Sequence, residues 1–400
     1  MPKRFTTLLD PDFVRDPFPT LAELRETAPV VWDPVIQTWV VTRHADVKAV
    51  MADPRLSRNR RLYKHYTPPA PGTWAAQHDE YSMWLADEEK HRRWRKQISA
   101  GFTPRAVRRM EGQVRAVVSQ FAGPLIGRRG RVDLVAEFTN PIPNTVISRI
   151  AGIPPYPGEE DRFRQLAQDV IRQFFPMADA ENMRRGELAM DELAEWIGKL
   201  ADERRQEPKD DLLSDLIVGN QGDDAMSNGQ IIMQVVVLVA AGSETTTLGG
   251  TQAIRLLLEH PDQLALLRAD PSLAQNAVRE VLRFDFGGAG MPLVASEDLE
   301  IGGVAIRSGD MVIGVVSSAN RDGTVFDDPD RFDIARDTRE SLIFGSGPHY
   351  CLGANLALQE LCCMLEGALK FLPQGARLGE AEWESIGLMR RPVDLPVDFG

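Results

Sequence analysis

The sequence predicts a mainly α-helical fold with a small β part, built as one continuous domain over residues 1–400. Helical periodicity dominates from about residue 85 to 285. The regions on either side hold short β-branched runs separated by turn residues. No repeat, low-complexity tract or Gly/Ser linker divides the 400 residues, although their number alone would favour two or three domains.

The predicted strands are short and lie outside the long helical region. Dipeptides typical of hairpin turns accompany them, at Gly302-Gly303 and Ser308-Gly309. The expected strand segments are Val31-Trp32, Thr38–Val41, Leu299–Ile306 and Met311–Val316.

Composition argues against several classes of function. The formal net charge of −12 disfavours general binding to nucleic acid. The first residues, MPKRFTTLLDPDF, contain no apolar run, so we expect a cytoplasmic protein without a secretion signal or membrane anchor. Cys362 and Cys363, two of three cysteines, are expected in the core, because so few cysteines favour neither a disulfide framework nor a four-ligand zinc site.

The N-terminal region predicts a helix and a hairpin over residues 12 to 60, followed by a polar and aromatic loop over residues 60 to 84. Irregular segments of this length are uncommon and often functional. A helix comes next, with Asp87 as its N-cap. His91 and Arg95 share one face of this helix because they are four residues apart. The helix carries a second cationic surface, formed by Arg92, Arg93 and Lys96.

A helix from Asn228 to about Glu259 is predicted as the buried centre of the fold. The capping-box pattern Ser227-x-x-Gln230 marks its start. At about 1.5 Å per residue it would be roughly 45 Å long and would cross the whole molecule. Its apolar run, Ile231 to Gly242, is shorter than the roughly twenty residues of a membrane span.

This helix contains Ala241-Gly242-Ser243-Glu244-Thr245-Thr246, an acid and alcohols among apolar neighbours. Burying a carboxylate without a partner is costly, so Glu244 is expected to have a role. Thr245 is expected to hydrogen-bond the Ala241 carbonyl and loosen the helix locally, and Ala241 leaves room for a small diatomic ligand. A purely structural threonine-rich kink is the alternative.

The stretch around which these elements are organised is Phe344 to Gly353, FGSGPHYCLG, at the start of a further helical run. Gly345, Gly347 and Gly353 allow backbone conformations and close approaches that a side chain would forbid, so the loop can wrap an atom bound to the Cys351 sulfur. Amide donors at the helix start favour a thiolate, and therefore a metal ligand, at Cys351. The alternative is a buried structural cysteine.

The pattern Phe-x-x-Gly-x-His-x-Cys-x-Gly, filled by Phe344, Gly347, His349, Cys351 and Gly353, resembles the haem-binding loop of the cytochrome P-450 superfamily. The likeness extends over essentially the whole chain and implies that family's fold, a single triangular-prism-like domain.

Three further motifs carry the same resemblance. His91 and Arg95 are similar to the family's propionate-binding His-x-x-x-Arg, and Ala241 to Thr246 are similar to its oxygen-activation motif. The family's structural Glu-Arg-Arg triad would be formed by Glu280, Arg283 and Arg331.

The resemblance implies a bound haem b whose iron is ligated by Cys351. It also implies that Thr245 and Glu244 are catalytic, with Thr245 donating a hydrogen bond to dioxygen and Glu244 relaying protons. The residues that would contact the cofactor are His91, Arg95, His349, Phe344, Gly345, Gly353 and Ala241.

The function implied is that of a monooxygenase that uses O2 to hydroxylate or epoxidise a hydrophobic small molecule such as a terpenoid, steroid or polyketide. The sequence lacks a flavin or nicotinamide fingerprint, so electrons are expected from a ferredoxin and a ferredoxin reductase that are separate proteins. Neither nucleic acid nor a membrane is an expected partner. One alternative is a peroxide-driven peroxygenase, which an intact Glu244-Thr245 pair disfavours. The other is a non-enzymatic haem-based ligand sensor, for which the chain has no signalling domain.

In the family, the connection from Phe284 to Leu293 passes over the haem beside the substrate. Its small residues, Gly287-Gly288-Ala289-Gly290, predict a roomy apolar cavity in which Asp285 orients the ligand. The alternative is that these glycines only permit a tight turn. Residues of the central helix expected to line this cavity are Val237, Ala240 and Ala241.

Two positions depart from the family's pattern. Leu293 stands where a third propionate-binding arginine is common, so one propionate would be paired differently. Leu358 stands where an arginine usually follows the cysteine loop, which removes a cation from the surface expected to receive the redox partner.

Overall fold

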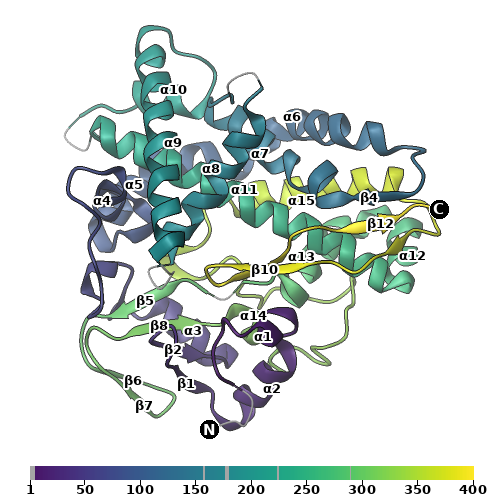
Figure 1. Ribbon diagram of the computed structural model, residues 1–400, viewed down its shortest axis with the longest axis horizontal. Coiled ribbons are helices and arrows are strands. Elements are labelled where there is room, and N and C mark those ends of the chain that lie inside the picture. The colour runs from purple at the N-terminus through teal and green to yellow at the C-terminus, as the bar shows by residue number, and fades with distance from the viewer. Residues whose placement is uncertain (1–4, 156–157, 176–179, 223–224, 289) are drawn as a thin grey trace.

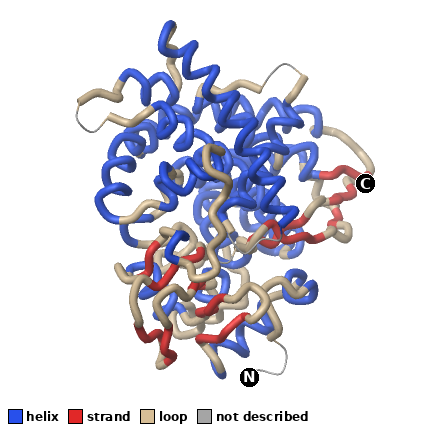
Figure 2. Tube along the Cα trace, turned by 60° about the vertical axis from the view of Figure 1, so that its left-hand side comes forward, coloured by secondary structure: helices blue, strands red, loops and turns tan. Residues whose placement is uncertain are grey.

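The computed structural model describes residues 5–155, 158–175, 180–222, 225–288 and 290–400. Helices form the bulk of the molecule, and Figure 2 shows the strands below this helical body and near the C-terminus. The prediction of a mainly α fold with a small β part is confirmed. The helices are α1 (Pro11–Arg15), α2 (Phe18–Thr27), α3 (His44–Ala52), α4 (Trp74–Tyr81), α5 (Glu88–Ile98), α6 (Pro104–Ala122), α7 (Pro141–Ala151), α8 (Glu160–Ile171), α9 (Ala180–Gln206), α10 (Leu212–Val218), α11 (Asn228–Glu259), α12 (Pro261–Ala269), α13 (Ala274–Asp285), α14 (Val316–Ala319) and α15 (Ala354–Phe371).

The largest sheet has the strand order β1-β2-β8-β5-β3, in which only β2 and β8 are parallel. A smaller sheet has the order β4-β12-β9, and two hairpins pair β6 with β7 and β10 with β11. The strands are β1 (Val30–Asp33), β2 (Thr38–Val41), β3 (Leu56–Ser57), β4 (Arg131–Asp133), β5 (Pro292–Ala295), β6 (Leu299–Ile301), β7 (Val304–Ile306), β8 (Met311–Gly314), β9 (Arg377–Leu378), β10 (Trp383–Ile386), β11 (Met389–Pro392) and β12 (Pro396–Asp398).

The predicted strands are largely confirmed, but one of them ends early. Residues 38–41 form β2 as predicted, and residues 299–306 form the β6–β7 hairpin around Gly302-Gly303. The segment predicted as Met311–Val316 stops at Gly314, because its neighbour β2 ends at Val41, and Val316 begins α14. The strands β3, β4, β5 and β9 to β12 were not predicted.

The predicted loop over residues 60 to 84 contains regular structure. It holds α4 together with the short 3-10 turns Arg60–Leu62 and Met83–Leu85. Thr73 is the N-cap of α4, since its hydroxyl accepts a hydrogen bond from the Ala76 amide at 3.2 Å. The prediction of an entirely irregular loop was therefore wrong, because a capped start and the helix-forming residues behind it outweigh the preceding prolines.

The central helix α11 has the predicted bounds and the predicted capping box. The Ser227 amide donates to Gln230 Oε1 at 2.8 Å, and the Gln230 amide donates to Ser227 Oγ at 3.3 Å. As a whole, α11 is long and apolar enough to cross a membrane, but 78% of its apolar window is buried within the protein. It packs on α7, α8, α9, α13 and α15, in the middle of the molecule (Figure 1). It is therefore the core helix.

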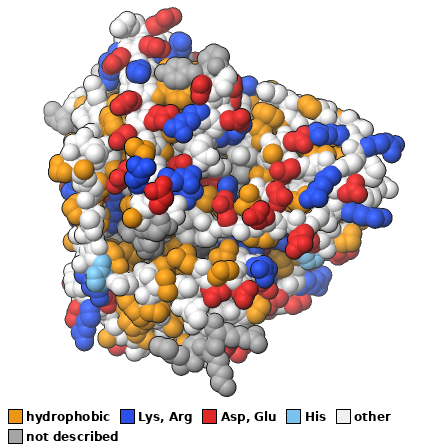
Figure 3. Space-filling model, viewed as in Figure 1, with side chains coloured by type: hydrophobic (Ala, Val, Ile, Leu, Met, Phe, Trp, Pro, Cys, Tyr) orange, Lys and Arg blue, Asp and Glu red, His pale blue; other side chains and the backbone are white. Residues whose placement is uncertain are grey.

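Acidic and basic side chains are interspersed over the helical part of the face in Figure 3, whereas hydrophobic side chains gather near the large sheet. The chain as a whole has a net charge of −12, but the acidic side chains on this face do not form one continuous acidic surface.

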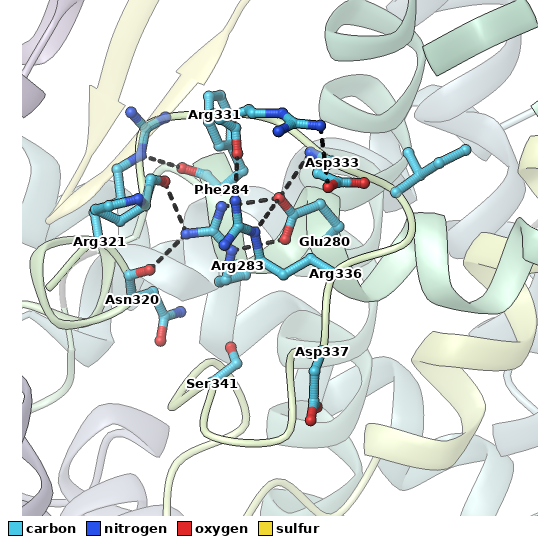
Figure 4. A network of polar contacts seen from close by, with 12 residues as sticks. Glu280, Arg283, Phe284, Asn320, Arg321, Arg331, Asp333, Arg336, Asp337 and Ser341 are labelled. Atoms are coloured by element: carbon cyan, nitrogen blue, oxygen red, sulfur yellow. Dashed lines mark hydrogen bonds and ion pairs between the residues drawn. The ribbon is translucent and has the colours of Figure 1, made fainter. Parts of the chain in front are cut away.

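A buried ionic network forms around Glu280 on α13 (Figure 4). Arg283 donates to both oxygens of this carboxylate, at 2.7 and 2.9 Å, and neither side chain is exposed. The second arginine on Glu280 is Arg336, at 3.2 Å, and not Arg331. Arg331 has a side chain that is 63% exposed and pairs with Asp333 at 3.5 Å. The prediction of Arg331 in the triad was wrong, because its side chain turns to solvent, and Arg331 contributes its carbonyl, which accepts a hydrogen bond from Arg336.

The network also reaches the segment that leads into the cysteine loop. Arg283 Nη1 donates to the Asn320 carbonyl at 2.8 Å. The Asn320 side chain in turn accepts a hydrogen bond from the Leu342 amide at 2.8 Å. Helix α13 therefore holds the backbone just ahead of Phe344 in place.

Replacing Arg336 and replacing Arg331 should have different effects on stability. Arg336→Ala should lower the free energy of unfolding by about 3 kcal/mol, because it leaves a buried carboxylate and several carbonyls with fewer donors. Arg331→Ala should change it by less than about 0.5 kcal/mol, as expected for an exposed side chain. Urea unfolding followed by circular dichroism measures both. Equal losses would contradict the assignment of Arg336.

Glu360 on α15 is a buried acid that the ionic network does not include. It is 3% exposed, and one carboxyl oxygen has no hydrogen-bond partner among the described residues. Desolvation raises the pKa of Glu360 from 4.5 to about 8. The folded protein therefore holds a proton on Glu360 that the unfolded chain releases at neutral pH.

This difference predicts a pH-dependent effect of Glu360→Gln. Below the unfolded pKa of 4.5 both states bind the proton, and the penalty for folding grows as the pH rises toward 8. Each pKa unit corresponds to about 1.4 kcal/mol, so the variant should gain several kcal/mol of stability over the wild type at about pH 8 and little at about pH 5. Urea unfolding at both pH values is the measurement. A gain that is independent of pH would show that Glu360 is ionised in the folded protein.

Candidate active site

The cysteine loop folds back on itself before α15 begins. The Cys351 amide donates to the Phe344 carbonyl at 2.8 Å, which closes the loop. Gly345 and Gly347 have φ values of 74° and 68°, in the region that favours glycine, as the sequence predicted. Gly353 differs, because its φ of −85° suits any residue. A side chain there would enter open space, so Gly353 keeps the room beside the loop clear.

Cys351 is the exposed cysteine of the three, whereas Cys363 is buried and Cys362 is intermediate. Desolvation raises the pKa of the Cys351 thiol, opposed by the Gly353 amide and the charge of Arg95. The protein groups alone therefore favour the thiol. The thiolate expected from the sequence requires an additional positive charge, such as a metal ion bound to the sulfur.

Helix α5 brings the predicted His91 and Arg95 to this loop. The rings of His91 and His349 lie with centroids 3.9 Å apart, and Arg95 donates to the Tyr350 carbonyl at 2.6 Å. Asp87 stands at the N-cap as predicted, but its carboxylate does not cap the helix. It instead accepts a hydrogen bond from the backbone of the preceding strand segment, at the Arg58 amide, at 3.0 Å.

Both histidines are neutral at neutral pH. Desolvation is the largest cause, followed by nearby arginine charges, and it lowers the pKa of His91 to about 4 and that of His349 to about 2. The arginines that contribute in both cases are Arg58 and Arg95. The region is thus rich in hydrogen-bond donors and positive charge, which suits a carboxylate ligand.

Helix α11 presents one partly exposed stripe on an otherwise buried stretch. Leu238, Ala241, Gly242 and Thr245 are partly exposed at the i, i+3, i+4 and i+7 positions, while the residues between them are buried. Thr245 Oγ1 donates to the Ala241 carbonyl at 2.6 Å, as the sequence predicted. This stripe provides an apolar surface with one hydroxyl, and α11 packs on the helix that follows Cys351.

Glu244 is buried beside the stripe, with 2% of its surface exposed. Its carboxylate pairs with Arg391 of β11, which also pairs with Glu384 of β10. Desolvation raises the pKa of Glu244, while Arg391 opposes that shift. The sequence called for a partner but did not identify it, because Arg391 lies 147 residues away in a hairpin that was not predicted. The adjacent arginines at 390 and 391 were the feature of the sequence that could have pointed to this partner.

The predicted polar group of the cavity, Asp285, is engaged elsewhere. It is 3% exposed and pairs with Arg390 at 2.6 Å and Arg255 at 2.7 Å. The prediction that Asp285 orients a ligand was therefore wrong. Ala240 is fully buried in the core, whereas Ala241 is on the open stripe.

At two positions after α13, glycine is required because another part of the backbone packs directly against it. A Cβ at Gly287 would collide with the Arg390 carbonyl, and one at Gly290 would collide with the Gly314 carbonyl. At both contacts the two backbone segments are also joined by a hydrogen bond. The structure supports the tight-packing alternative there, and Ala289 lies outside the described residues.

The residues gathered here fit a haem. Cys351 supplies a sulfur ligand with clear space beside its loop, the stripe on α11 supplies an apolar surface, and His91, Arg95 and His349 supply donors for propionates. The two departures noted in the sequence lie in the core, where Leu293 is 6% and Leu358 is 7% exposed.

Comparisons with known proteins found one matching family and many similar chains. Residues 29–371 match the family model described as cytochrome P-450. The chain is 38% identical over 367 residues to nocardicin C N-oxygenase of Nocardia uniformis subsp. tsuyamanensis, covering 90% of this chain and 89% of the relative. It is 36% identical over 397 residues to 6-deoxyerythronolide B hydroxylase of Saccharopolyspora erythraea, covering 96% of both chains. A solved structure of an epothilone D-bound cytochrome P-450 superposes with a TM-score of 0.89 at 29% identity, covering 99% of both chains.

Cys351 should determine the optical spectrum of the haem-loaded protein. The reduced, CO-bound wild type should show the red-shifted Soret band of thiolate-ligated haem, and Cys351→Ser should abolish it. Cys362→Ser is the matched control and should keep the band, because burial raises the pKa of Cys362 to about 12 and keeps it a thiol. Loss of the band in the Cys362 variant, with retention in the Cys351 variant, would refute the assignment.

Proposed function

Because this chain belongs to the cytochrome P-450 family, and is therefore a haem-dependent monooxygenase, we propose that it inserts one atom of dioxygen into a hydrophobic small molecule of polyketide, terpenoid or steroid type. The relatives include a hydroxylase of 6-deoxyerythronolide B and an epoxidase of epothilones C and D. The proposed reaction is hydroxylation or epoxidation, and the proposed cofactor form is haem b.

The observation that carries this proposal is the stripe on α11. Thr245 bonds to the Ala241 carbonyl at 2.6 Å on the partly exposed face of a helix that is otherwise buried along this stretch. A hydroxyl in such a position can rotate from the carbonyl to a small ligand in the adjoining space without unfolding the helix. That arrangement suits dioxygen, which accepts hydrogen bonds as it is reduced.

Each protein group has a proposed task. The haem held by Cys351 supplies, when bound, the redox chemistry that cleaves dioxygen. Thr245 donates a hydrogen bond to dioxygen. Glu244, whose pKa burial raises, carries a proton toward Thr245 when its carboxyl leaves Arg391. The ion pair with Arg391 therefore keeps the Glu244 carboxyl away from Thr245 until the pair opens.

Electrons are proposed to come from a separate ferredoxin and its reductase. Arg92 and Lys96 on α5 are exposed, and Arg92 makes a long contact to Glu89, at 3.7 Å. Exposed cations of this kind steer an acidic partner toward one face of the protein. Leu358 lies in the core and adds no charge there. The proposed location is the cytoplasm.

Thr245→Ala tests the proposal directly. With a surrogate ferredoxin and reductase, the variant should bind substrate and accept electrons but divert most of them to peroxide, because the hydroxyl that directs protons is lost. The measurement is product formed per reducing equivalent, with labelled dioxygen to identify the inserted atom. Thr247→Ala, which removes a buried hydroxyl of the same helix, should stay coupled.

Two results would contradict the proposal. Unchanged coupling in Thr245→Ala would remove this residue from the mechanism. Product that forms with hydrogen peroxide but never with dioxygen and electrons would identify a peroxygenase instead.

A further inference from the structure

Two haem propionates would require more cations than the site's motifs supply, because Leu293 stands where a propionate-binding arginine is common. Leu293 is buried in an apolar cluster with Leu56, Val312 and Leu342. Two buried carboxylates need more than one cation between them, since an unpaired charge in the interior is costly. A replacement must therefore come from a segment beside β5.

Strand β3 is the neighbour of β5 on that side. The two pair antiparallel, with Leu56 opposite Ala295 and Ser57 opposite Val294. Arg58 directly follows Ser57, and Leu293 directly precedes its partner Val294 along the chain. Arg58 also lines a small pocket with Met291 and Pro292, the two residues before Leu293. Arg58 thus lies beside the segment in which the missing arginine would have stood.

Asp87 fixes Arg58 against the start of α5. Its carboxylate accepts hydrogen bonds from the Arg58 amide, at 3.0 Å, and from the Ser57 hydroxyl. Its carbonyl accepts from the His91 amide at 3.2 Å, one helical turn further on. The strand end and the histidine are thereby held by one residue. The charge of Arg58 accordingly contributes to lowering the pKa of His91.

The guanidinium of Arg58 has no ion pair or hydrogen bond within the part of the chain that the structure describes. It lies over the Trp84 ring, 6.0 Å from the centroid. Arg60, two residues further on, differs because it pairs with Asp79 and donates to the Gln173 carbonyl. Of these two inward arginines, Arg58 is the one available to a ligand.

We propose that Arg58 binds a haem propionate and replaces the arginine absent at position 293. The inference rests on the proposed haem site, to which it adds a binding residue from the segment just after β3 that the family motifs do not include. The same guanidinium also lines a small pocket with Trp84, Phe174 and Met291. A carboxylate of the substrate is therefore the competing ligand that the experiment must distinguish.

Haem loss tests the proposal without relying on activity. The rate of haem transfer to excess apomyoglobin is measured for the wild type, Arg58→Leu, and the double variant Arg58→Leu/Leu293→Arg. Arg58→Leu should lose haem about tenfold faster, the effect of one charge-assisted hydrogen bond. The double variant should return to near the wild-type rate, because the cation is restored from the opposing strand. Arg55→Leu, which removes an exposed arginine that pairs with Asp53 just before β3, should match the wild type.

Reconstitution with the dimethyl ester of haem identifies the atoms involved. Esterified propionates carry no charge, so the wild type and Arg58→Leu should lose this haem at the same rate. A difference that persists with the ester would overturn the proposal and assign Arg58 a structural role.

Two further outcomes separate this inference from others. Unchanged loss of ordinary haem in Arg58→Leu, with weakened binding of carboxylate ligands such as a long-chain fatty acid, would overturn it in favour of the substrate. Failure of the wild type to hold haem with a thiolate spectrum would overturn the proposed function itself, and this inference with it.

Discussion

The buried ion pairs of Glu280 are the interaction on which the site most depends. Glu280 and Arg283 lie in the dry interior, where each charge would be costly without the other. Arg336 adds a third member from a distant loop, and Arg283 extends the network to Asn320. Such a network adds little net stability compared with apolar packing, but it tolerates few alternative arrangements. Its role here is to hold the loop that carries Cys351 against the helical core.

Two other buried acids are treated in the same way. Glu244 pairs with Arg391, and Asp285 pairs with Arg390 and Arg255. Adjacent arginines of one short C-terminal strand thus neutralise two acids that come from different helices. The hairpin β10–β11 is small, yet it determines whether Glu244 is charged and where its carboxyl points. Its contribution to the site is electrostatic.

The part of the site around His91 and His349 is positively charged. His91 and His349 lie close together as neutral, tilted rings, while Arg58 and Arg95 provide the positive charge around them. The same charge opposes the desolvation of the Cys351 thiol, since Arg95 stabilises its anion. Anion binding and metal ligation would therefore support each other, because both depend on a region that the protein keeps electropositive.

Local patterns in the sequence determined α11, its capping box and the Thr245 bond to Ala241, because these depend on residues within a few positions of each other. The conformations at Gly345 and Gly347 were predictable for the same reason.

Pairings across the fold were decided only by the tertiary structure. Arg336 rather than Arg331 completes the network, Arg391 meets Glu244, and Arg58 lies beside His91. A charge on a long side chain can reach many positions, so spacing along the chain does not identify its partner. Desolvation is decided by the same packing, which is why burial, and not composition, determines the protonation of Glu360.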